Sequence, residues 1–162
     1  MNIDHNVRLR YFLGFLFIAA ILVLAEYLEI YQGMIPCPLC MVQRYFLIAL
    51  ATIFLLGVVF KRGQVFLGLL SLLAASGGIL FSARQTCLQY YPKDTLGECG
   101  VSFDYMLKTL PFNEVIKEVW QGGMECSEKG WVFLGLSLAE WSLIAFVIFA
   151  IFSILQLKSS TN

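Results

Sequence analysis

The chain has 162 residues, of which 59% are hydrophobic and only 14% are charged. A soluble domain of ordinary composition carries about a quarter charged residues, so this composition excludes a typical water-soluble fold. Basic and acidic residues number 11 each, which leaves no net charge. We expect a protein embedded in the lipid bilayer, with no nucleic-acid partner.

Four apolar stretches predict the architecture, because a membrane-spanning helix needs about 20 mainly apolar residues. We place the spans at about residues 11–30, 41–60, 64–83 and 141–157, with loops at about 31–40 and 84–140. The prediction is an all-α bundle of four transmembrane helices in one domain, residues 1–162. No small-residue cleavage site follows the first stretch, which is therefore read as a retained helix and not as a signal peptide.

The positions of the basic residues predict the orientation in the membrane. Five of them lie close to helix ends on one side: Arg8, Arg10, Lys61, Arg62 and Lys158. On the other side they are spread over the long loop, which is also rich in acidic residues. We therefore expect both termini in the cytoplasm of a bacterium. All five cysteines then lie on the periplasmic side of the inner membrane, where disulfides persist.

Two further patterns concern packing. Ser76-Gly77-Gly78 in the third stretch permits close helix approach, although a lipid-facing glycine pair is the alternative. The long loop is punctuated by proline and glycine, so most of it is expected to be irregular and mobile. Within it, a short amphipathic helix is predicted after Pro111 by five apolar residues at helical spacing: Phe112, Val115, Ile116, Val119 and Trp120. It lies either in the headgroup plane or against its own bundle.

The pair Cys37-Pro38-Leu39-Cys40 stands where the first loop becomes the second helix. This spacing holds two sulfurs close enough to form and break a disulfide, within reach of a lipid-soluble electron carrier. If the helix begins near Pro38, Cys40 lies in its first turn, where the helix dipole favours a thiolate. Arg44 shares a helix face with Cys40, and Gln43 lies beside it. We predict that Arg44 stabilises the thiolate and an oxygen of a bound acceptor; the alternative is a headgroup anchor.

Cys99 and Cys126 lie in flexible, polar parts of the long loop. They form either a structural disulfide or a second redox dithiol that exchanges with the first, and the neighbouring C-x-x-C favours exchange. We expect them to be the most water-exposed cysteines. No metal site is expected, because structural zinc takes two close-spaced ligand pairs. Cys87 has no obvious partner and is read as a bystander thiol.

Glu26 and Glu29 lie one helical turn apart near the outer end of the first span. Reduction of a quinone consumes protons, so these carboxylates are candidates for a proton relay. The alternative is a pair of interfacial acids that end the helix.

Taken in chain order, these motifs resemble the DsbB family of bacterial disulfide-forming membrane proteins, over nearly the whole chain. The resemblance rests on the following segments: Pro36–Cys40 with Arg44, Leu88–Pro92, the loop pair Cys99 and Cys126, and Trp131–Leu136 leading to Trp141. Arg84-Gln85 stands where some members place an acid and a histidine, which leaves no histidine at that position here.

The resemblance implies a bound quinone (ubiquinone or menaquinone) from the membrane quinone pool and a soluble, DsbA-like partner with a thioredoxin fold. Such a relay is what keeps the bacterial periplasm oxidising. It implies catalytic roles for Cys37, Cys40, Cys99 and Cys126, and a quinone contact for Gln89. The partner thiolate is expected to attack the Cys99–Cys126 disulfide, after which Cys126 exchanges onto Cys37. Which loop cysteine is attacked follows from the family alone.

The function predicted from these observations is a membrane oxidoreductase that reoxidises a periplasmic dithiol protein and reduces quinone. One alternative is a vitamin K epoxide reductase-like protein, in which the C-x-x-C should open the last core helix and not the second. The other is a non-enzymatic four-helix membrane protein with a structural disulfide in its outer loop.

Overall fold

Four long helices make up most of the computed structural model, which describes residues 2–33, 37–60, 63–91 and 103–161. They are α1 (Asn2–Gln32), α2 (Pro38–Val59), α3 (Gln64–Tyr90) and α7 (Leu138–Thr161). Each contains a segment long and apolar enough to cross a membrane: Val7–Tyr31, Pro38–Val59, Gln64–Tyr90 and Leu138–Lys158. The prediction of an all-α, multi-pass membrane protein is confirmed.

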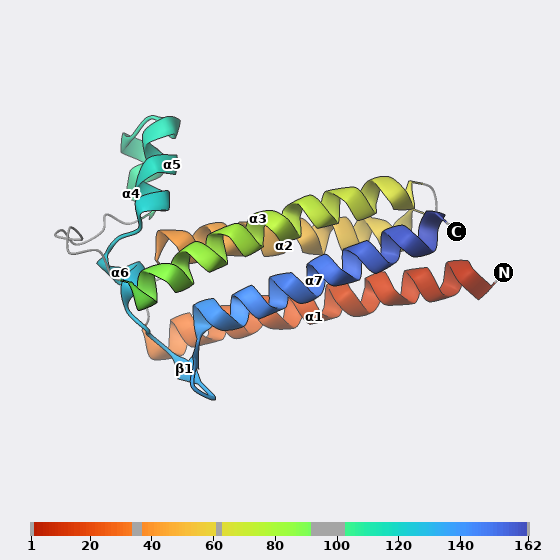
Figure 1. Cartoon of the computed structure of the whole chain (residues 1–162), viewed down its shortest axis with the longest axis horizontal. Coiled ribbons are helices and arrows are strands. Elements are labelled where there is room, and N and C mark those ends of the chain that lie inside the picture. The colour runs from red at the N-terminus through yellow and green to blue at the C-terminus, as the bar shows by residue number, and fades with distance from the viewer. Residues whose placement is uncertain (1, 34–36, 61–62, 92–102, 162) are drawn as a thin grey trace.

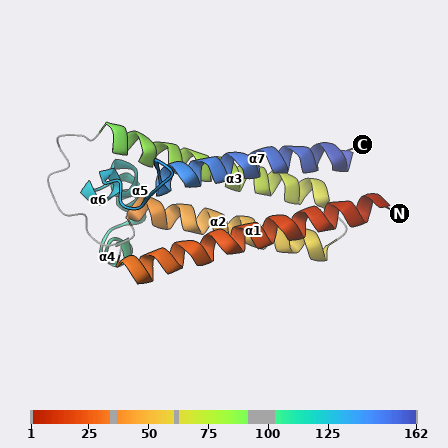
Figure 2. The same ribbon diagram turned by 90° about the horizontal axis from the view of Figure 1, so that it is seen from below.

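The four helices lie side by side along one axis (Figures 1 and 2). α3 packs against both α7 and α2, and α2 packs against α1. The two termini lie at the same end of the bundle, and the short elements between α3 and α7 gather at the opposite end (Figure 1). We call the latter the loop end.

Aromatic and aliphatic side chains fill the centre of the bundle. Tyr11, Phe54 and Phe146 are almost completely buried there, and the rings of Tyr11 and Phe54 meet edge to face at 5.5 Å. Gly77 lies directly against Phe46 of α2, and Gly78 lies against Phe146 of α7, so a Cβ at either position would overlap a ring. The predicted close approach at these glycines is confirmed.

Within the described residues, most of the segment between α3 and α7 forms short helices and strands. α3 itself continues to Tyr90, beyond the predicted span end at residue 83. Then come α4 (Phe103–Thr109), α5 (Phe112–Gln121) and α6 (Met124–Ser127). A two-stranded antiparallel hairpin follows, formed by β1 (Val132–Phe133) and β2 (Leu136–Ser137). The expectation of a mostly irregular loop is therefore wrong for residues 103–137, because this segment has its own apolar side chains to bury.

The predicted amphipathic helix is present as α5. Val115 and Val119 are buried against the loop end of the bundle, whereas Phe112 and Ile116 on the same helix remain exposed. The valine face of α5 therefore packs on its own bundle, which is the second of the two predicted placements.

A second apolar cluster at the loop end ties the short helices to the long ones. Its buried members come from α2 and its N-cap and from α3, α4, α5 and α6: Cys37, Leu39, Leu88, Met106, Val115, Val119 and Cys126. Two of these members are cysteines far apart in the sequence. The packing that folds the loop back therefore also brings sulfur atoms together.

Candidate redox site

Cys37 is the N-cap of α2, and Pro38 occupies the first helical turn. The preset φ of proline suits this position, and its missing N–H costs nothing there. The Cys37 sulfur accepts a hydrogen bond from the Cys40 backbone N–H at 3.3 Å, as an N-cap side chain does. The two sulfurs lie 2.9 Å apart. The predicted helix start at Pro38 and the position of Cys40 in the first turn are both confirmed.

Cys126 lies against Cys37. It belongs to α6, which follows Gly122 with its φ of +72°, a conformation that favours glycine. Cys126 is 0% exposed, so the prediction that it is among the most water-exposed cysteines is wrong. The reason is tertiary: Leu39 and Leu88 cover it from two long helices. Cys99 lies outside the described residues.

The hydrogen bond between Cys37 and Cys126 sets their acidities in opposite directions. It raises the pKa of Cys37 well above its ordinary value, with further contributions from the hydrogen bond to Cys40 and from burial. The same bond lowers the pKa of Cys126, and backbone hydrogen bonds from Leu39 and Gly123 lower it further. In the reduced protein Cys37 is thus the hydrogen-bond donor of the pair, and the Cys126 sulfur gains thiolate character.

A chain of uncharged side chains leads from α7 to the sulfur atoms. The Ser142 hydroxyl donates to Gln43 Oε1 at 2.6 Å, and Gln43 Nε2 donates to Gln85 Oε1 at 2.7 Å. Because the Gln85 oxygen is engaged in this way, its amide nitrogen points at the cysteines. It lies 3.1 Å from Cys40 Sγ and 3.4 Å from Cys37 Sγ. Gln43 and Gln85 are both buried.

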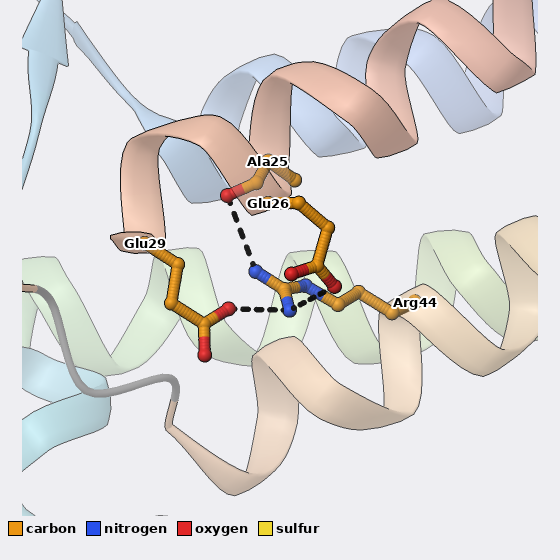
Figure 3. Close-up of polar contacts among 4 residues, drawn as sticks. All are labelled: Ala25, Glu26, Glu29 and Arg44. Carbon is orange, nitrogen blue, oxygen red and sulfur yellow. Dashed lines mark hydrogen bonds and ion pairs between the residues drawn. The ribbon is translucent and has the colours of Figure 1, made fainter. Parts of the chain in front are cut away.

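Arg44 reaches across from α2 to α1, as Figure 3 shows. Its guanidinium forms ion pairs with Glu29 and, at 3.3 Å, with Glu26. It also donates to the backbone carbonyl of Ala25 at 3.4 Å. The Arg44 side chain is 18% exposed and the Glu29 side chain 29%, whereas that of Glu26 is 62% exposed. Glu29 therefore forms the more buried of the two pairs.

A cavity of about 430 Å³ opens beside these groups. Its walls include residues singled out from the sequence, among them Glu29, Cys37, Cys40, Gln43 and Arg44. Gln89 also lines it and is held by the Ser137 hydroxyl, which donates to Gln89 Oε1 at 2.6 Å. The three predicted cofactor contacts, Gln43, Arg44 and Gln89, therefore lie around one space. Cys87 is exposed and is not among the residues that line the cavity.

Three contributors to this site are not indicated by local sequence patterns. At Gln85 the sequence shows only that a histidine is absent, whereas in the structure the Gln85 amide touches both sulfurs. Ser142 gives no signal in the sequence, because a serine within an apolar helix is common and its partner Gln43 is 99 residues away. The link between Glu29 and Arg44 was also missed, although an acidic residue near the end of one span and a basic residue near the start of the next were the signal for it.

Comparison with known proteins relates the chain to one protein family. Residues 7–156 match the family described as disulfide bond formation protein DsbB. Disulfide bond formation protein B 1 of Pseudomonas aeruginosa is 43% identical over 152 residues, which cover 92% of this chain and 93% of that protein. Disulfide bond formation protein B of Azoarcus sp. is 40% identical, covering 89% of this chain and 88% of the relative. The protein of that name from Methylococcus capsulatus is 36% identical, covering 93% and 94%.

Replacing Gln85 should slow the chemistry of Cys40 and weaken the fold. In Gln85→Leu, Cys40 loses an N–H donor, and the buried Gln43 amide loses its acceptor, which costs about 1–3 kcal/mol of unfolding free energy. We expect alkylation of Cys40 in the reduced protein to slow several-fold, as followed by mass spectrometry, and the thermal unfolding temperature to fall. Thr86→Val is the matched control, because the Thr86 hydroxyl donates only to its own helix, at the Ser82 carbonyl. Alkylation of Gln85→Leu at the wild-type rate would contradict the assigned role.

Proposed function

The chain belongs to the DsbB family of disulfide bond formation proteins, and from that premise we propose that it oxidises a periplasmic dithiol protein and passes the electrons to a membrane quinone. The dithiol protein is DsbA-like, with a thioredoxin fold. The observation that carries the proposal is a single cavity lined by Cys37, Cys40 and Arg44. Membership of a family of disulfide-forming proteins argues against a non-enzymatic membrane protein. The C-x-x-C opens the second helix and not the last, which argues against a vitamin K epoxide reductase-like protein.

The residues around the cavity suit a quinone, either ubiquinone or menaquinone. A volume of about 430 Å³ falls within the range of small-molecule sites. The walls combine apolar side chains such as Ile21 and Leu47 with the Arg44 guanidinium, and a guanidinium is a natural donor to a carbonyl oxygen. Arg44, with Gln43 and Gln89, would hold the ring. A bound quinone supplies a lipid-soluble acceptor for two electrons.

The arrangement of the sulfurs supports a direction for disulfide exchange. The Cys126 sulfur lies against Cys37, so when Cys37 and Cys40 are joined in a disulfide, a Cys126 thiolate is placed to attack the Cys37 sulfur. A Cys37–Cys126 bond then forms, and Cys40 is released as a thiolate into the cavity beside Arg44. Exchange of this kind conserves disulfides, since one S–S bond breaks for each that forms. The electrons that the partner delivers to the loop thus arrive at Cys40.

The proposed location is the bacterial inner membrane, with both termini in the cytoplasm. Support comes from the basic residues that flank the helix ends on the side of the termini. The loop end, which carries Cys37 and Cys126, is then periplasmic, where a soluble thioredoxin-fold protein would meet it.

The proposal is tested by adding quinone to the purified, reduced protein in detergent. We expect disulfides to form at the expense of free thiols, in step with loss of the oxidised quinone absorbance. Thiol counts that stay constant with both ubiquinone and menaquinone analogues would contradict quinone-dependent oxidase activity.

Arg44→Ala should weaken quinone use without affecting disulfide exchange. The guanidinium is a fixed positive charge, and its loss should raise the apparent quinone KM and lower kcat/KM by roughly a hundredfold or less. Arg44→Lys should recover part of the loss, because it keeps the charge but not the planar fork. Steady-state quinone reduction is measured beside stoichiometric exchange with the partner in the absence of quinone. If quinone kinetics are unchanged in Arg44→Ala, Arg44 serves only as a membrane-boundary anchor.

Cys126→Ser should trap a mixed disulfide between Cys99 and the partner, formed when the Cys99 thiolate attacks the disulfide of the oxidised partner and releases one partner thiol; Cys126 is then missing as the resolving thiol. Cys126 is completely buried, so a soluble protein cannot reach its sulfur, and the resemblance to the family implies that Cys99 is the cysteine that reacts with the partner. Non-reducing electrophoresis and mass spectrometry of the adduct provide the measurement. Cys87→Ala is the control and should retain close to full thiol oxidation in cells, since its thiol lies away from the cavity. Recovery of the adduct exclusively through Cys37 would show that the relay order is wrong.

A further inference from the structure

Acidic side chains at the rim of the cavity can supply a proton for quinone reduction, a step that the roles given to the cysteines and Arg44 do not include. Two-electron reduction of a quinone forms two O–H bonds and so consumes two protons. When a Cys37 thiol and a Cys40 thiolate close to a disulfide, two electrons leave the sulfurs and the S–H bond of Cys37 supplies one proton. Cys40, released as a thiolate, supplies none. The second proton therefore has to come from another group.

Most of the other side chains around the cavity cannot supply this proton. Arg44 stays protonated at any working pH and releases no proton. Gln43 and Gln85, like Ser142, do not titrate in the physiological range. Among the described residues that line the cavity, the carboxyl groups belong to Glu29, Glu125 and Glu128.

Glu29 is distinguished from the other two by its contact with Arg44 (Figure 3). It lies at the end of α1, and its side chain is 29% exposed, so it borders water as well as the cavity. Glu125 and Glu128 come from the α6 side and form no ion pair with Arg44 among the contacts of the described residues. The groups that face Glu29 are thus Arg44 from α2, Glu26 from its own helix, and these two carboxyls across the cavity.

We propose that Glu29 is the proton-transfer residue of the site, taking a proton from water at the rim and releasing it beside the Arg44 guanidinium to a reduced oxygen. The inference rests on the proposed quinone function and adds the proton route to it. In the structure, Glu29 and Glu26 together occupy one guanidinium nitrogen of Arg44. When an acceptor oxygen takes that nitrogen, the Glu29 carboxylate loses its cation in a partly buried place. The acceptor oxygen then stands beside the released Glu29 carboxyl group, which also borders water.

The kinetic test compares Glu29→Gln with Glu29→Asp and Glu26→Gln. Glutamine keeps the shape but carries no exchangeable acid, so kcat for quinone reduction should fall roughly 10–100-fold, with a smaller change in KM. In the wild type, kcat should decline with rising pH as the donor loses its proton, and this decline should be absent in Glu29→Gln. Glu29→Asp should restore part of the rate and the pH dependence. Glu26→Gln is the matched control, because it removes the other, more exposed carboxylate from the same Arg44 nitrogen.

A second measurement needs no turnover. When a quinone binds to the fully oxidised protein, proton uptake is recorded with a pH-indicator dye in weakly buffered detergent. Wild type and Glu26→Gln should take up a proton, whereas Glu29→Gln should not. Stoichiometric disulfide exchange with the partner should be the same in all variants, which establishes that they are folded.

The results separate this inference from the proposed function. If wild type reduces quinone but Glu29→Gln matches Glu26→Gln in pH profile and proton uptake, the proton role of Glu29 is wrong while the function stands. A change confined to KM in Glu29→Gln would also overturn it, because Glu29 would then only position Arg44. If wild type exchanges disulfides but does not reduce quinone, the proposed function itself fails, and the proton route fails with it.

Discussion

Cys37 caps α2 and at the same time touches the sulfurs of Cys40 and Cys126. Much of the loop end is arranged around this contact. Proline at the start of α2 fixes the backbone that presents Cys37, and the cluster that includes Val115 and Val119 holds Cys126 against it. A redox relay needs its sulfurs in contact, and in this chain the loop cysteine is brought into place by packing of apolar side chains. Loosening that cluster would separate two dithiols that have to react.

The interior near the sulfurs is polar but uncharged, whereas charge is confined to the rim. A buried ion near the membrane would cost several kcal/mol, and the pair Gln43 and Gln85 avoids this cost while still directing an N–H group at the thiols. Arg44 is a charged residue of the second span, and it lies where two acids of α1 can neutralise it. The same position brings a permanent positive charge to the wall of the cavity. The position of Arg44 thus both neutralises its charge and places that charge at the cavity.

Local patterns predicted the four spans, the start of α2 at Pro38 and the helix after Pro111, because each depends on periodicity or on a single turn of backbone. Contacts between side chains on different helices could not be predicted from such local patterns. Gln85 donates to Cys37, which is 48 residues away, and nothing in either flank specifies the other. The exposure of Cys126 was misjudged for the same reason: polar, glycine-rich neighbours indicate a surface loop, and only the fold-back of α5 and α6 onto Leu39 and Leu88 buries the sulfur.

Burial of Cys126 also bears on how the two dithiols divide their work. A sulfur with no access to water is protected from soluble thiols, so a reducing agent or a wrong partner cannot readily intercept it. Its reaction with Cys37 is intramolecular, and holding reactants in contact can replace a large part of the barrier. In the reduced protein the Cys37 thiol donates to Cys126, which raises the pKa of Cys37 and lowers that of Cys126. The exchange between the loop and the C-x-x-C is accordingly set by the fold, whereas encounter with a partner falls to the rest of the loop.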